Sequence, residues 1–474
     1  MASSPQADHV PGAAHLPRLV IGAPASGHGK TTVASGLMAA LRARGLTVAP
    51  GKVGPDYIDP GYHALATGRP GRNLDPVLCG EDRIVPLLRH GAAGADVAII
   101  EGVMGLFDGQ FGTDGFGSTA HVARLTRSPI VLVVDISHVS QTVAAWVHGL
   151  ATFDPRLRVA GVILNKAGSP RHASEAVRSL EATGVEVLGV LHRDAGIVAP
   201  SRHLGLVPVA ERAEAAGELG RLAAQLADAV DLDALLAIAE SAPPLAEPPW
   251  DPATEVTRVN GEPVIAVAGG RSFTFRYAEN TELLTAAGCR VVEFDPLTDA
   301  RLPTGTSGIL LGGGFPEVYA ESLAQNAALT ADLAAHVRAG VPTIAECAGL
   351  LYLARSLDGH PMADIVAARA AMTPKLTLGY RTAIAPTDNL VAAAGTRVRG
   401  HEFHRTQLDP PAGERAGWLL DGRPDGYASA SLHASYLHVH WAGFPDMASR
   451  FAAAAATCAE RLVEFSNHVI EGER

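Results

Sequence analysis

Short apolar runs alternate with amphipathic stretches along this chain, and that alternation strongly limits the folds it can adopt. In the first half, apolar runs predict strands at 19–21, 46–49, 96–100, 130–134, 159–164 and 187–191. Predicted helices separate several of them, at 30–44, 141–150 and 171–183. Strands that alternate with helices form a mostly parallel sheet with helices on both faces. We therefore predict a doubly wound α/β domain in this half.

A proline-rich stretch then interrupts the alternation. Residues 241–250 include four prolines, which fit neither a helix interior nor a central strand, so we predict a linker at 241–261. A second series of strands is predicted at 264–268, 290–294, 308–311 and 342–345. The chain of 474 residues is also longer than one hydrophobic core usually serves. We therefore predict four segments: a disordered tail at 1–17, an α/β domain at 18–240, the linker, and a second α/β domain at 262–474.

Charge and hydropathy exclude several classes of protein. Lys and Arg number 38 against 49 Asp and Glu, and the net charge of −11 argues against binding along a nucleic-acid backbone. Apolar runs such as 130–134 are far shorter than the roughly 20 residues that cross a bilayer. Residues 1–17 lack the basic start and apolar stretch of a signal peptide. We expect a cytoplasmic protein with no nucleic-acid or membrane partner.

A glycine-rich segment, Gly22-Ala-Pro-Ala-Ser-Gly-His-Gly-Lys-Thr-Thr32, joins the first predicted strand to the first predicted helix. This is the setting of a P-loop, whose backbone N–H groups surround phosphate while a lysine contacts the β- and γ-phosphates and a hydroxyl binds Mg²⁺. The match to GxxxxGK[ST] is imperfect, because Pro24 stands at the first glycine position. The alternative is a glycine-rich turn followed by an exposed lysine. The predicted nucleotide-binding residues are Gly27, Gly29, Lys30, Thr31 and Thr32.

Two acidic motifs, Lys52-Val-Gly-Pro-Asp-Tyr-Ile-Asp-Pro60 and Glu101-Gly-Val-Met-Gly-Leu-Phe-Asp-Gly109, follow predicted strands. Ligands of open parallel sheets bind outside the carboxyl ends of the strands, and Mg²⁺ prefers oxygen ligands. We predict a metal site formed by Thr31, Asp56 and Glu101. Each carboxylate taken alone could equally be a turn or N-cap group. After another strand, Asn165 is predicted to meet the base, and the missing Asp of the guanine-reading NKxD pattern favours ATP over GTP.

Cys347 lies where a predicted strand turns sharply into a predicted helix, within Thr343-Ile-Ala-Glu-Cys-Ala-Gly-Leu-Leu-Tyr-Leu353. A nucleophile at such a turn is exposed at the sheet edge, and the helix N-terminus favours its thiolate. We predict that Cys347 is a nucleophile, against the alternative of a buried structural cysteine. That alternative is retained for Cys79, Cys289 and Cys458, whose spacing suggests neither a disulfide framework nor a zinc site.

The segment Ser435-Tyr-Leu-His-Val-His-Trp441 is predicted to be a strand, on which His438 and His440 point to opposite faces. We predict that His438 is the base for Cys347 and that His440 is a substrate-binding or structural residue. Gly312-Gly-Gly-Phe-Pro-Glu317 follows a predicted strand, so its backbone N–H groups are candidate donors to a tetrahedral oxyanion. The predicted oxyanion donors are Gly313, Gly314 and Ala348.

Six motifs together resemble, in order and spacing, the cobyrinic/hydrogenobyrinic acid a,c-diamide synthases of cobalamin biosynthesis. The motifs are GKTT, VGPDYIDPGYH, EGVMGLFDG, GGGFPE, AECAGLLYL and SYLHVHW, and the likeness runs from about residue 18 to 460. That family joins a dethiobiotin-synthetase-like ATP domain to a triad-type class I glutamine amidotransferase domain, which is flavodoxin-like. The resemblance implies ATP- and glutamine-dependent amidation of the a and c side-chain carboxylates of hydrogenobyrinic or cobyrinic acid, through an acyl phosphate.

The resemblance also implies roles for individual residues and names the ligands. Cys347 matches the glutaminase nucleophile and His438 its activating partner. The residues implied for the synthetase site are Asp56, Tyr57, Asp59, His63 and Asp108. His401 and His404 are candidates to line the corrin site, with a surface-loop pair as the alternative. The implied ligands are ATP, Mg²⁺, L-glutamine and a corrin, and a homodimer is compatible with the sequence.

This chain departs from the family pattern in three places. Ala348 stands where the elbow usually has a first Gly, which a negative φ would tolerate. Most class I glutaminases carry His-x-Glu, but this chain has His438-Val-His440, so a Cys–His dyad is expected. Arg271-Ser272 stands where smaller or apolar residues are expected, and the sequence does not explain it.

Other activities stay open on the sequence. Nickel-sirohydrochlorin a,c-diamide synthase and cobyric acid synthase share the architecture, although VGPDYIDPGYH favours the a,c-diamide group over the latter. A P-loop switch or metal-insertion NTPase with a degenerate glutaminase domain is a further alternative, and the presence of both Cys347 and His438 counts against it. No residue distinguishes cobalt-loaded, nickel-loaded and metal-free rings. High Ala, Gly and Arg usage, typical of a GC-rich genome, favours the metal-free hydrogenobyrinic substrate.

Overall fold

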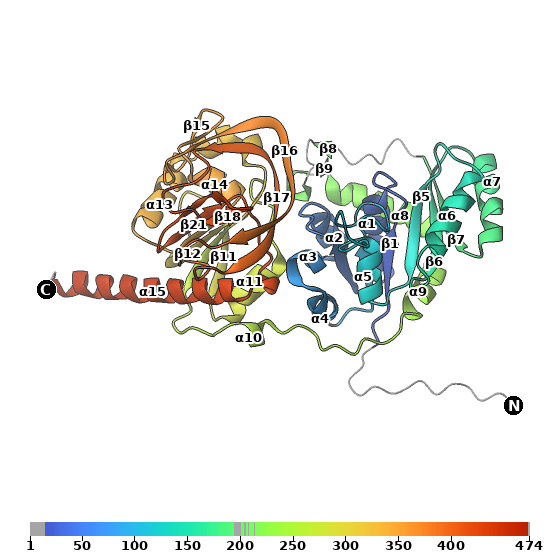
Figure 1. Ribbon diagram of the computed structural model, residues 1–474, viewed down its shortest axis with the longest axis horizontal. Coiled ribbons are helices and arrows are strands. Elements are labelled where there is room, and N and C mark those ends of the chain that lie inside the picture. The colour runs from blue at the N-terminus through green and yellow to red at the C-terminus, as the bar shows by residue number, and fades with distance from the viewer. Residues whose placement is uncertain (1–14, 194–200, 203–204, 207, 213, 473–474) are drawn as a thin grey trace. The chain divides into compact units, whose positions relative to one another are not determined.

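The computed structural model describes residues 15–193, 201–202, 205–206, 208–212 and 214–472 (Figure 1). The chain divides into two compact units, Met1–Trp250 and Asp251–Arg474. The predicted tail at 1–17 lies almost wholly outside the described residues. Within the predicted linker, Trp250 is buried, and its backbone N–H donates to the Pro86 carbonyl at 2.9 Å. A short helix, α10 (Pro252–Glu255), follows it.

Unit 1 is built on a seven-stranded sheet in the order β3-β2-β4-β1-β5-β6-β7, whose neighbouring strands all run parallel. The strands are β1 (Arg18–Gly22), β2 (Val48–Val53), β3 (Arg72–Leu74), β4 (Val97–Glu101), β5 (Ile130–Asp135), β6 (Val159–Ala167) and β7 (Glu186–His192). The predicted parallel α/β sheet is confirmed. The sequence did not predict β3, which is only three residues long.

Helices follow nearly every strand of unit 1. They are α1 (Lys30–Ala43), α2 (Asp59–Thr67), α3 (Pro76–Cys79), α4 (Ile84–Gly91), α5 (Thr119–Leu125), α6 (Thr142–Thr152), α7 (Pro170–Leu180), α8 (Ala215–Ala229) and α9 (Leu232–Glu240). A small hairpin, β8 (Ser201–Arg202) with β9 (Gly205–Leu206), precedes α8. Helices α1, α8 and α9 share one apolar core with the central strands. Gly36 permits the contact between α1 and α8, because a Cβ there would lie 2.8 Å from Leu222.

Unit 2 contains a second sheet of the same kind, in the order β11-β10-β12-β13-β21-β20. The strands are β10 (Val264–Ala268), β11 (Arg290–Phe294), β12 (Thr306–Leu311), β13 (Thr343–Glu346), β20 (Tyr427–Ala428) and β21 (Leu432–Ser435). Only β20 runs antiparallel to its neighbour. Two α/β units are therefore present, as predicted. The predicted strand at 435–441 is wrong, because β21 ends at Ser435 and the following residues leave the sheet.

Unit 2 also has a mostly antiparallel sheet, which strand–helix alternation did not predict. Its strands are β14 (Ser356–Leu357), β15 (His360–Pro361), β16 (Arg369–Ile384), β17 (Arg397–Asp409), β18 (Trp418–Leu420) and β19 (Arg423–Asp425). Among these strands only β14 and β16 pair in parallel, and the long antiparallel pair β16 and β17 dominates this sheet (Figure 1). The helices of unit 2 beyond α10 are α11 (Ala278–Ala286), α12 (Ala320–Gln325), α13 (Ala327–Arg338), α14 (Ala348–Leu353) and α15 (Asp446–Gly472).

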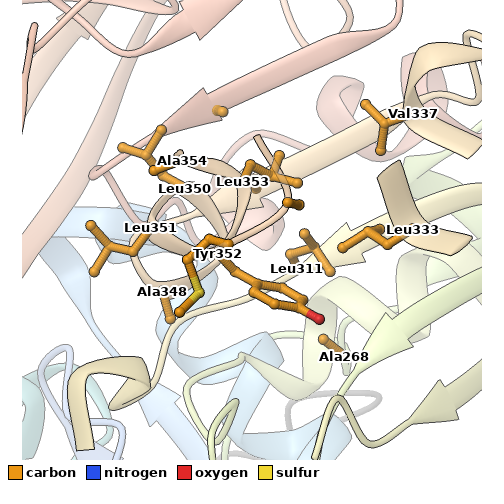
Figure 2. Packing of buried hydrophobic residues seen from close by; sticks show 14 of the residues in the cluster. Ala268, Leu311, Leu333, Val337, Ala348, Leu350, Leu351, Tyr352, Leu353 and Ala354 are labelled. Atoms are coloured by element: carbon orange, nitrogen blue, oxygen red, sulfur yellow. The ribbon is translucent and has the colours of Figure 1, made fainter. Parts of the chain in front are cut away.

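Helix α14, which begins directly after Cys347, lies inside the core of unit 2. Figure 2 shows Tyr352 of this helix extending toward Ala268 and Leu311, with Leu333 and Val337 of α13 nearby. All six residues of α14 are buried. The helix is therefore held on every side, and this packing fixes the turn that carries Cys347. Among the described residues, no helix is both long enough and apolar enough to span a membrane.

Candidate functional sites

The glycine-rich loop of unit 1 connects β1 to α1 with two glycines in the left-handed region. Gly27 has a φ of 86° and Gly29 a φ of 92°. A Cβ on Gly29 would lie 2.3 Å from Nδ2 of Asn165, which donates to the His28 carbonyl at 3.0 Å. No side chain caps the start of α1 at Lys30. The loop therefore presents an uncapped helix N-terminus, which is a suitable environment for a phosphate group.

Lys30 and Thr31, the first two residues of α1, extend from this loop. Lys30 Nζ donates to the carbonyls of Ala25 and Met104. Burial, with the nearby Lys52 ammonium, lowers the pKa of Lys30 to about 8. The hydroxyl of Thr31 donates to Oε1 of Glu101 at 2.7 Å. The P-loop thus meets the acidic motif that follows β4, as the sequence predicted.

A buried cluster of charged side chains lies beside Thr31. Lys52 Nζ is 2.7 Å from Oδ2 of Asp59 and 2.9 Å from Oε1 of Glu101. His63 Nε2 lies 2.6 Å from Oε2 of the same Glu101. All four side chains come from strand ends or from α2, and each is at most 11% exposed. Lys52 was assigned no role from its motif, because the strand predicted at 46–49 ends before it, whereas β2 extends to Val53.

The cluster shifts the pKa values of its two carboxyl groups in opposite directions. Burial would raise the pKa of Glu101, but the Lys52 ammonium and the hydrogen bond from His63 hold it well below its usual range. Burial and the neighbouring Asp56 raise the pKa of Asp59 well above its usual range. Burial lowers the pKa of Lys52, yet Asp59 and Glu101 together raise it above its ordinary value. The Lys52 ammonium therefore favours the ionised form of Glu101, while Asp59 holds its proton to a higher pH than an ordinary aspartate.

The other predicted residues of unit 1 lie around this cluster. Oδ1 of Asp56 accepts the backbone N–H groups of Ile58 and Asp59, which is the turn role considered as its alternative. Of the two aspartates in this motif, Asp59 is the one whose carboxyl accepts from the Thr31 hydroxyl, at 3.2 Å. Oδ2 of Asp108 accepts the Gly105 N–H at 3.0 Å. Tyr57 is buried, and Thr32 is half-buried on α1.

The oxygens around Thr31 fit a magnesium ion that is completed by a nucleotide. Within the described residues, no three His, Cys, Asp or Glu side chains are arranged to hold a metal ion by themselves. Protein-bound Mg²⁺ does not require such a cage, because it commonly takes one or two carboxylates together with phosphate oxygens and water. The hydroxyl of Thr31 with carboxyl oxygens of Glu101 and Asp59 is a donor set of that kind.

In unit 2, Cys347 lies at the strained turn between β13 and α14. Its φ is 48° and its ψ is −98°, and its backbone N–H donates to the Ser435 carbonyl at 2.8 Å. The prediction of an exposed sulfur is wrong, because the residue is 3% exposed. Burial and the carboxylate of Glu317 raise the pKa of the thiol, although a hydrogen bond from the Ala348 N–H opposes them. The resting group is a thiol rather than the predicted thiolate, and it needs a base to ionise.

His438 lies beyond the end of β21, the strand next to β13 in the sheet. Its backbone forms two hydrogen bonds with His401 of β17, at 2.9 and 3.0 Å. Its ring lies against Gly313, where a Cβ would come within 2.2 Å of the ring carbon Cε1. Burial, with His401 and His404 nearby, lowers the pKa of His438 to about 3. The imidazole is therefore neutral at pH 7 and able to accept a proton.

The predicted oxyanion donors are placed differently from one another. The N–H of Gly313 donates to the Phe275 carbonyl at 3.1 Å, so that donor is already engaged. Gly314 lies against the backbone of Ser272, where a Cβ would come 2.1 Å from the carbonyl oxygen. This contact accounts for the glycine at position 314, and Arg271-Ser272 has no structural explanation. The Ala348 N–H, which points at the Cys347 sulfur, is the predicted donor nearest the nucleophile.

The remaining predicted histidines separate into two groups. His401 and His404 are buried on β17 rather than on a surface loop. His404 stacks on Tyr436, with ring centroids 3.9 Å apart, and lies 3.5 Å from Glu402. His440 lies elsewhere, with its ring 4.2 Å from that of Tyr277 and its Nε2 3.5 Å from Glu279. These contacts favour the structural alternative for His440.

Two family models match the chain on either side of the proline-rich stretch. The CobQ/CobB/MinD/ParA nucleotide binding domain matches residues 19–207, and the CobB/CobQ-like glutamine amidotransferase domain matches residues 264–445. A hydrogenobyrinate a,c-diamide synthase of Thermobifida fusca is 59% identical over 94% of this chain and 98% of its own length. The chain belongs to the a,c-diamide synthase family.

Other a,c-diamide synthases are less similar. The hydrogenobyrinate a,c-diamide synthase of Streptomyces coelicolor is 52% identical over 92% of this chain and 97% of its own. The cobyrinate a,c-diamide synthase of Gloeobacter violaceus is 44% identical over 91% of this chain and 96% of its own. The resemblance drawn from the six motifs is thereby confirmed at the level of the family. The P-loop lies within the nucleotide-binding match, and Cys347 and His438 lie within the amidotransferase match.

Proposed function

We propose that this chain converts the a and c side-chain carboxylates of hydrogenobyrinic acid into amides, using ATP and glutamine. The observation that carries the proposal is that one chain holds two complementary sites: a P-loop facing a buried charged cluster, and a cysteine and a histidine at the ends of adjacent strands. The choice of the metal-free ring is supported by the relatives, because those named for hydrogenobyrinate are 50–59% identical and those named for cobyrinate 40–44%.

In unit 1 the proposed reaction activates a carboxylate that ammonia would not attack by itself, since the oxygen would be a poor leaving group. Transfer of the γ-phosphoryl group of ATP to the corrin carboxylate gives an acyl phosphate, whose phosphate leaves readily. Lys30 would exchange its two backbone carbonyl partners for phosphate oxygens. Asn165, whose amide donates to the His28 carbonyl of the loop, is proposed to contact the nucleotide. Glu101, fixed by Lys52 and His63, keeps its carboxylate directed at Thr31.

Mg²⁺ held by Thr31, Glu101 and Asp59 would supply positive charge to the phosphate oxygens. Asp56 contributes indirectly in this scheme, because its carboxylate forms the turn that positions Asp59. Tyr57 lies in the segment after β2 and Asp108 in the segment after β4. Both are proposed to orient the acceptor carboxylate.

In unit 2 the proposed reaction releases ammonia from glutamine. The Cys347 thiol gives its proton to neutral His438, and the sulfur attacks the amide carbon. The Ala348 N–H stabilises the oxyanion, and the imidazolium returns the proton to the departing nitrogen. Water then hydrolyses the thioester to glutamate. His401 and His404, buried around His438, are proposed to line this site, with either glutamine or the corrin as the group they contact.

The test is amidation by Cys347→Ala with two nitrogen donors. We expect no product from glutamine and near wild-type product from ammonium chloride at alkaline pH, measured by mass spectrometry with hydrogenobyrinic and cobyrinic acids offered separately. Wild-type amidation from glutamine by Cys347→Ala would contradict the role of the thiol. ATP hydrolysis without any glutamate release by the wild-type chain would instead favour an NTPase with a degenerate glutaminase domain.

A further inference from the structure

Glu346 is the residue immediately before the proposed nucleophile, at the last position of β13. Its Oε2 lies 3.8 Å from Nδ1 of His438. Its Oε1 accepts the backbone N–H of Val439, the residue that follows His438, at 3.4 Å. One carboxyl group therefore contacts both the ring and the main chain of the segment that carries the proposed base.

This geometry follows from the register of two strands. Glu346 of β13 pairs with Ser435 of β21, so the chain beyond Ser435 passes over the end of β13. The Glu346 side chain is about 11% exposed and that of His438 about 1%, which leaves little water to compete for either group. Burying a carboxyl group at the end of an apolar strand costs free energy unless the group has a hydrogen-bonding or charged partner.

We infer that Glu346 is a positioning residue for His438 and supplies the carboxyl group that class I glutaminases usually place two residues after the histidine. This inference rests on the proposed glutaminase reaction. The chain has His440 at the usual position of that carboxylate, and His440 packs against Tyr277 and Glu279 instead. The carboxyl group reaches the same ring nitrogen from the neighbouring strand.

The inferred role assigns one ring nitrogen to each step. Nδ1 is the nitrogen that lies near Glu346, and in the proposed reaction Nε2 accepts the thiol proton. During attack the S–H bond breaks, the S–C bond forms and the ring becomes an imidazolium, which a carboxylate at Nδ1 stabilises. The proton then leaves Nε2 for the amide nitrogen as the C–N bond breaks. Glu346 neither gains nor loses a proton in these steps, and we expect the distance of 3.8 Å to shorten when the ring becomes charged.

Several ionisable groups surround this pair and set its environment. Cys347 is next to Glu346 in the chain, while Glu317 and Glu402 lie near the sulfur. On the other side, His401 and His404 lie near His438. Burial raises the pKa of Glu346 to about 8, opposed in part by the Val439 N–H. A glutaminase that depends on this carboxylate should therefore become faster as the pH rises through that region.

The experiment compares the glutaminase kinetics of Glu346→Gln and Glu346→Asp with wild type, from pH 6 to pH 10. We expect Glu346→Gln to lower kcat about 100-fold with a much smaller change in KM, and to lose the rise in rate near pH 8. Glu346→Asp should recover part of kcat and keep the rise. The matched control is Glu279→Gln, which removes the carboxylate beside His440 and should leave both kcat and the pH profile unchanged.

Two further measurements separate the possible failures. Hydrogen exchange in β13 and β21 reports whether unit 2 of each variant still folds, and Cys347→Ala is assayed in parallel. If Cys347→Ala is inactive with glutamine while Glu346→Gln keeps wild-type kcat and pH profile, the positioning role is wrong and the proposed function stands. If Cys347→Ala hydrolyses glutamine normally, the proposed function itself fails. Should Glu346→Gln fail to fold, the pH profile of Glu346→Asp decides, and a profile without the rise would overturn the role.

Discussion

Lys52 Nζ lies 2.9 Å from Oε1 of Glu101, and the two residues are register partners on the adjacent parallel strands β2 and β4. The ammonium also contacts Asp59 at 2.7 Å, so one buried cation serves two carboxyl groups. Because the pairing is set by strand register, the charges converge only when both strands are correctly placed. The stability of this sheet edge and the geometry proposed for phosphoryl transfer therefore depend on the same three side chains.

Lys52→Met should destabilise unit 1 by about 3–5 kcal/mol, because it leaves buried carboxyl groups without their cation. The measurement is pulsed hydrogen exchange at increasing urea, read from peptides that contain β2 and β4. Arg44→Met is the matched control, since it breaks an exposed pair with Asp233 and should cost less than about 1 kcal/mol. Equal losses in the two variants would show that the buried cluster contributes no special stability.

Glu101→Gln should stop ATP-dependent amidation while glutamate is still released from glutamine. The amide keeps the shape of the side chain but cannot supply the charge directed at Thr31 and Lys52. Glutaminase activity in the same preparation reports on unit 2, and thermal unfolding reports on the fold of unit 1. Wild-type amidation by a folded Glu101→Gln protein would remove Glu101 from the proposed metal site.

Sequence reasoning predicted the parallel sheet of unit 1 and the meeting of Thr31 with Glu101, because strand–helix alternation places all strand ends at one edge. It did not identify Asp59, rather than Asp56, as the carboxyl of its motif that reaches Thr31, since both residues belong to one motif and only the turn decides between them. Lys52 was missed for a related reason. A lysine inside a strand becomes informative only when its register partner is known.

In unit 2, the sequence predicted local features but not contacts between distant segments. The elbow with Cys347 was predicted from local signals: a strand, small residues and a helix. The antiparallel pair β16 and β17 was missed, because its long strands depend on cross-strand partners far apart in the sequence. The contact between Glu346 and His438 joins residues more than ninety positions apart, and no local pattern encodes it.

Gly29→Ala should weaken ATP binding by at least about tenfold. The φ of 92° is strained for alanine, and the new Cβ would lie 2.3 Å from the Asn165 amide that holds the loop. Gly45→Ala is the control, because its φ of 89° imposes the same backbone strain with no atom within 4 Å of the added Cβ. Isothermal titration with a non-hydrolysable ATP analogue measures both variants, and equal affinities would contradict the role of the Gly29–Asn165 contact.

Mutation of the two histidines of the SYLHVHW motif should have different effects, one on activity and the other on stability. His438→Asn should abolish glutamate release, whereas His440→Asn should lower the melting temperature by removing the contacts with Tyr277 and Glu279. Glutamate release per folded molecule should stay close to wild type in the second variant. A loss of kcat in His440→Asn without any loss of stability would instead place His440 in the reaction.

Glu346→Gln should stabilise unit 2 at alkaline pH, although it removes a group inferred to assist catalysis. Burial raises the pKa of Glu346 from 4.5 to about 8, so folding favours the protonated acid. A raised folded-state pKa gives stability that is complete below the unfolded value and is lost as the pH rises through the folded one. The wild-type protein should therefore lose a few kcal/mol between about pH 5 and pH 8.5 that the glutamine variant keeps.

Urea denaturation of both proteins at about pH 5 and pH 8.5, followed by hydrogen exchange in β13 and β21, measures this difference. The two proteins should be nearly equal in stability at the lower pH and diverge at the higher one, with the variant the more stable. A difference that does not change with pH would show that the carboxyl group ionises freely in the folded chain. If the predicted divergence accompanies a loss of glutaminase activity in the same variant, the buried acid at the end of β13 costs stability over the pH range in which its charge assists His438.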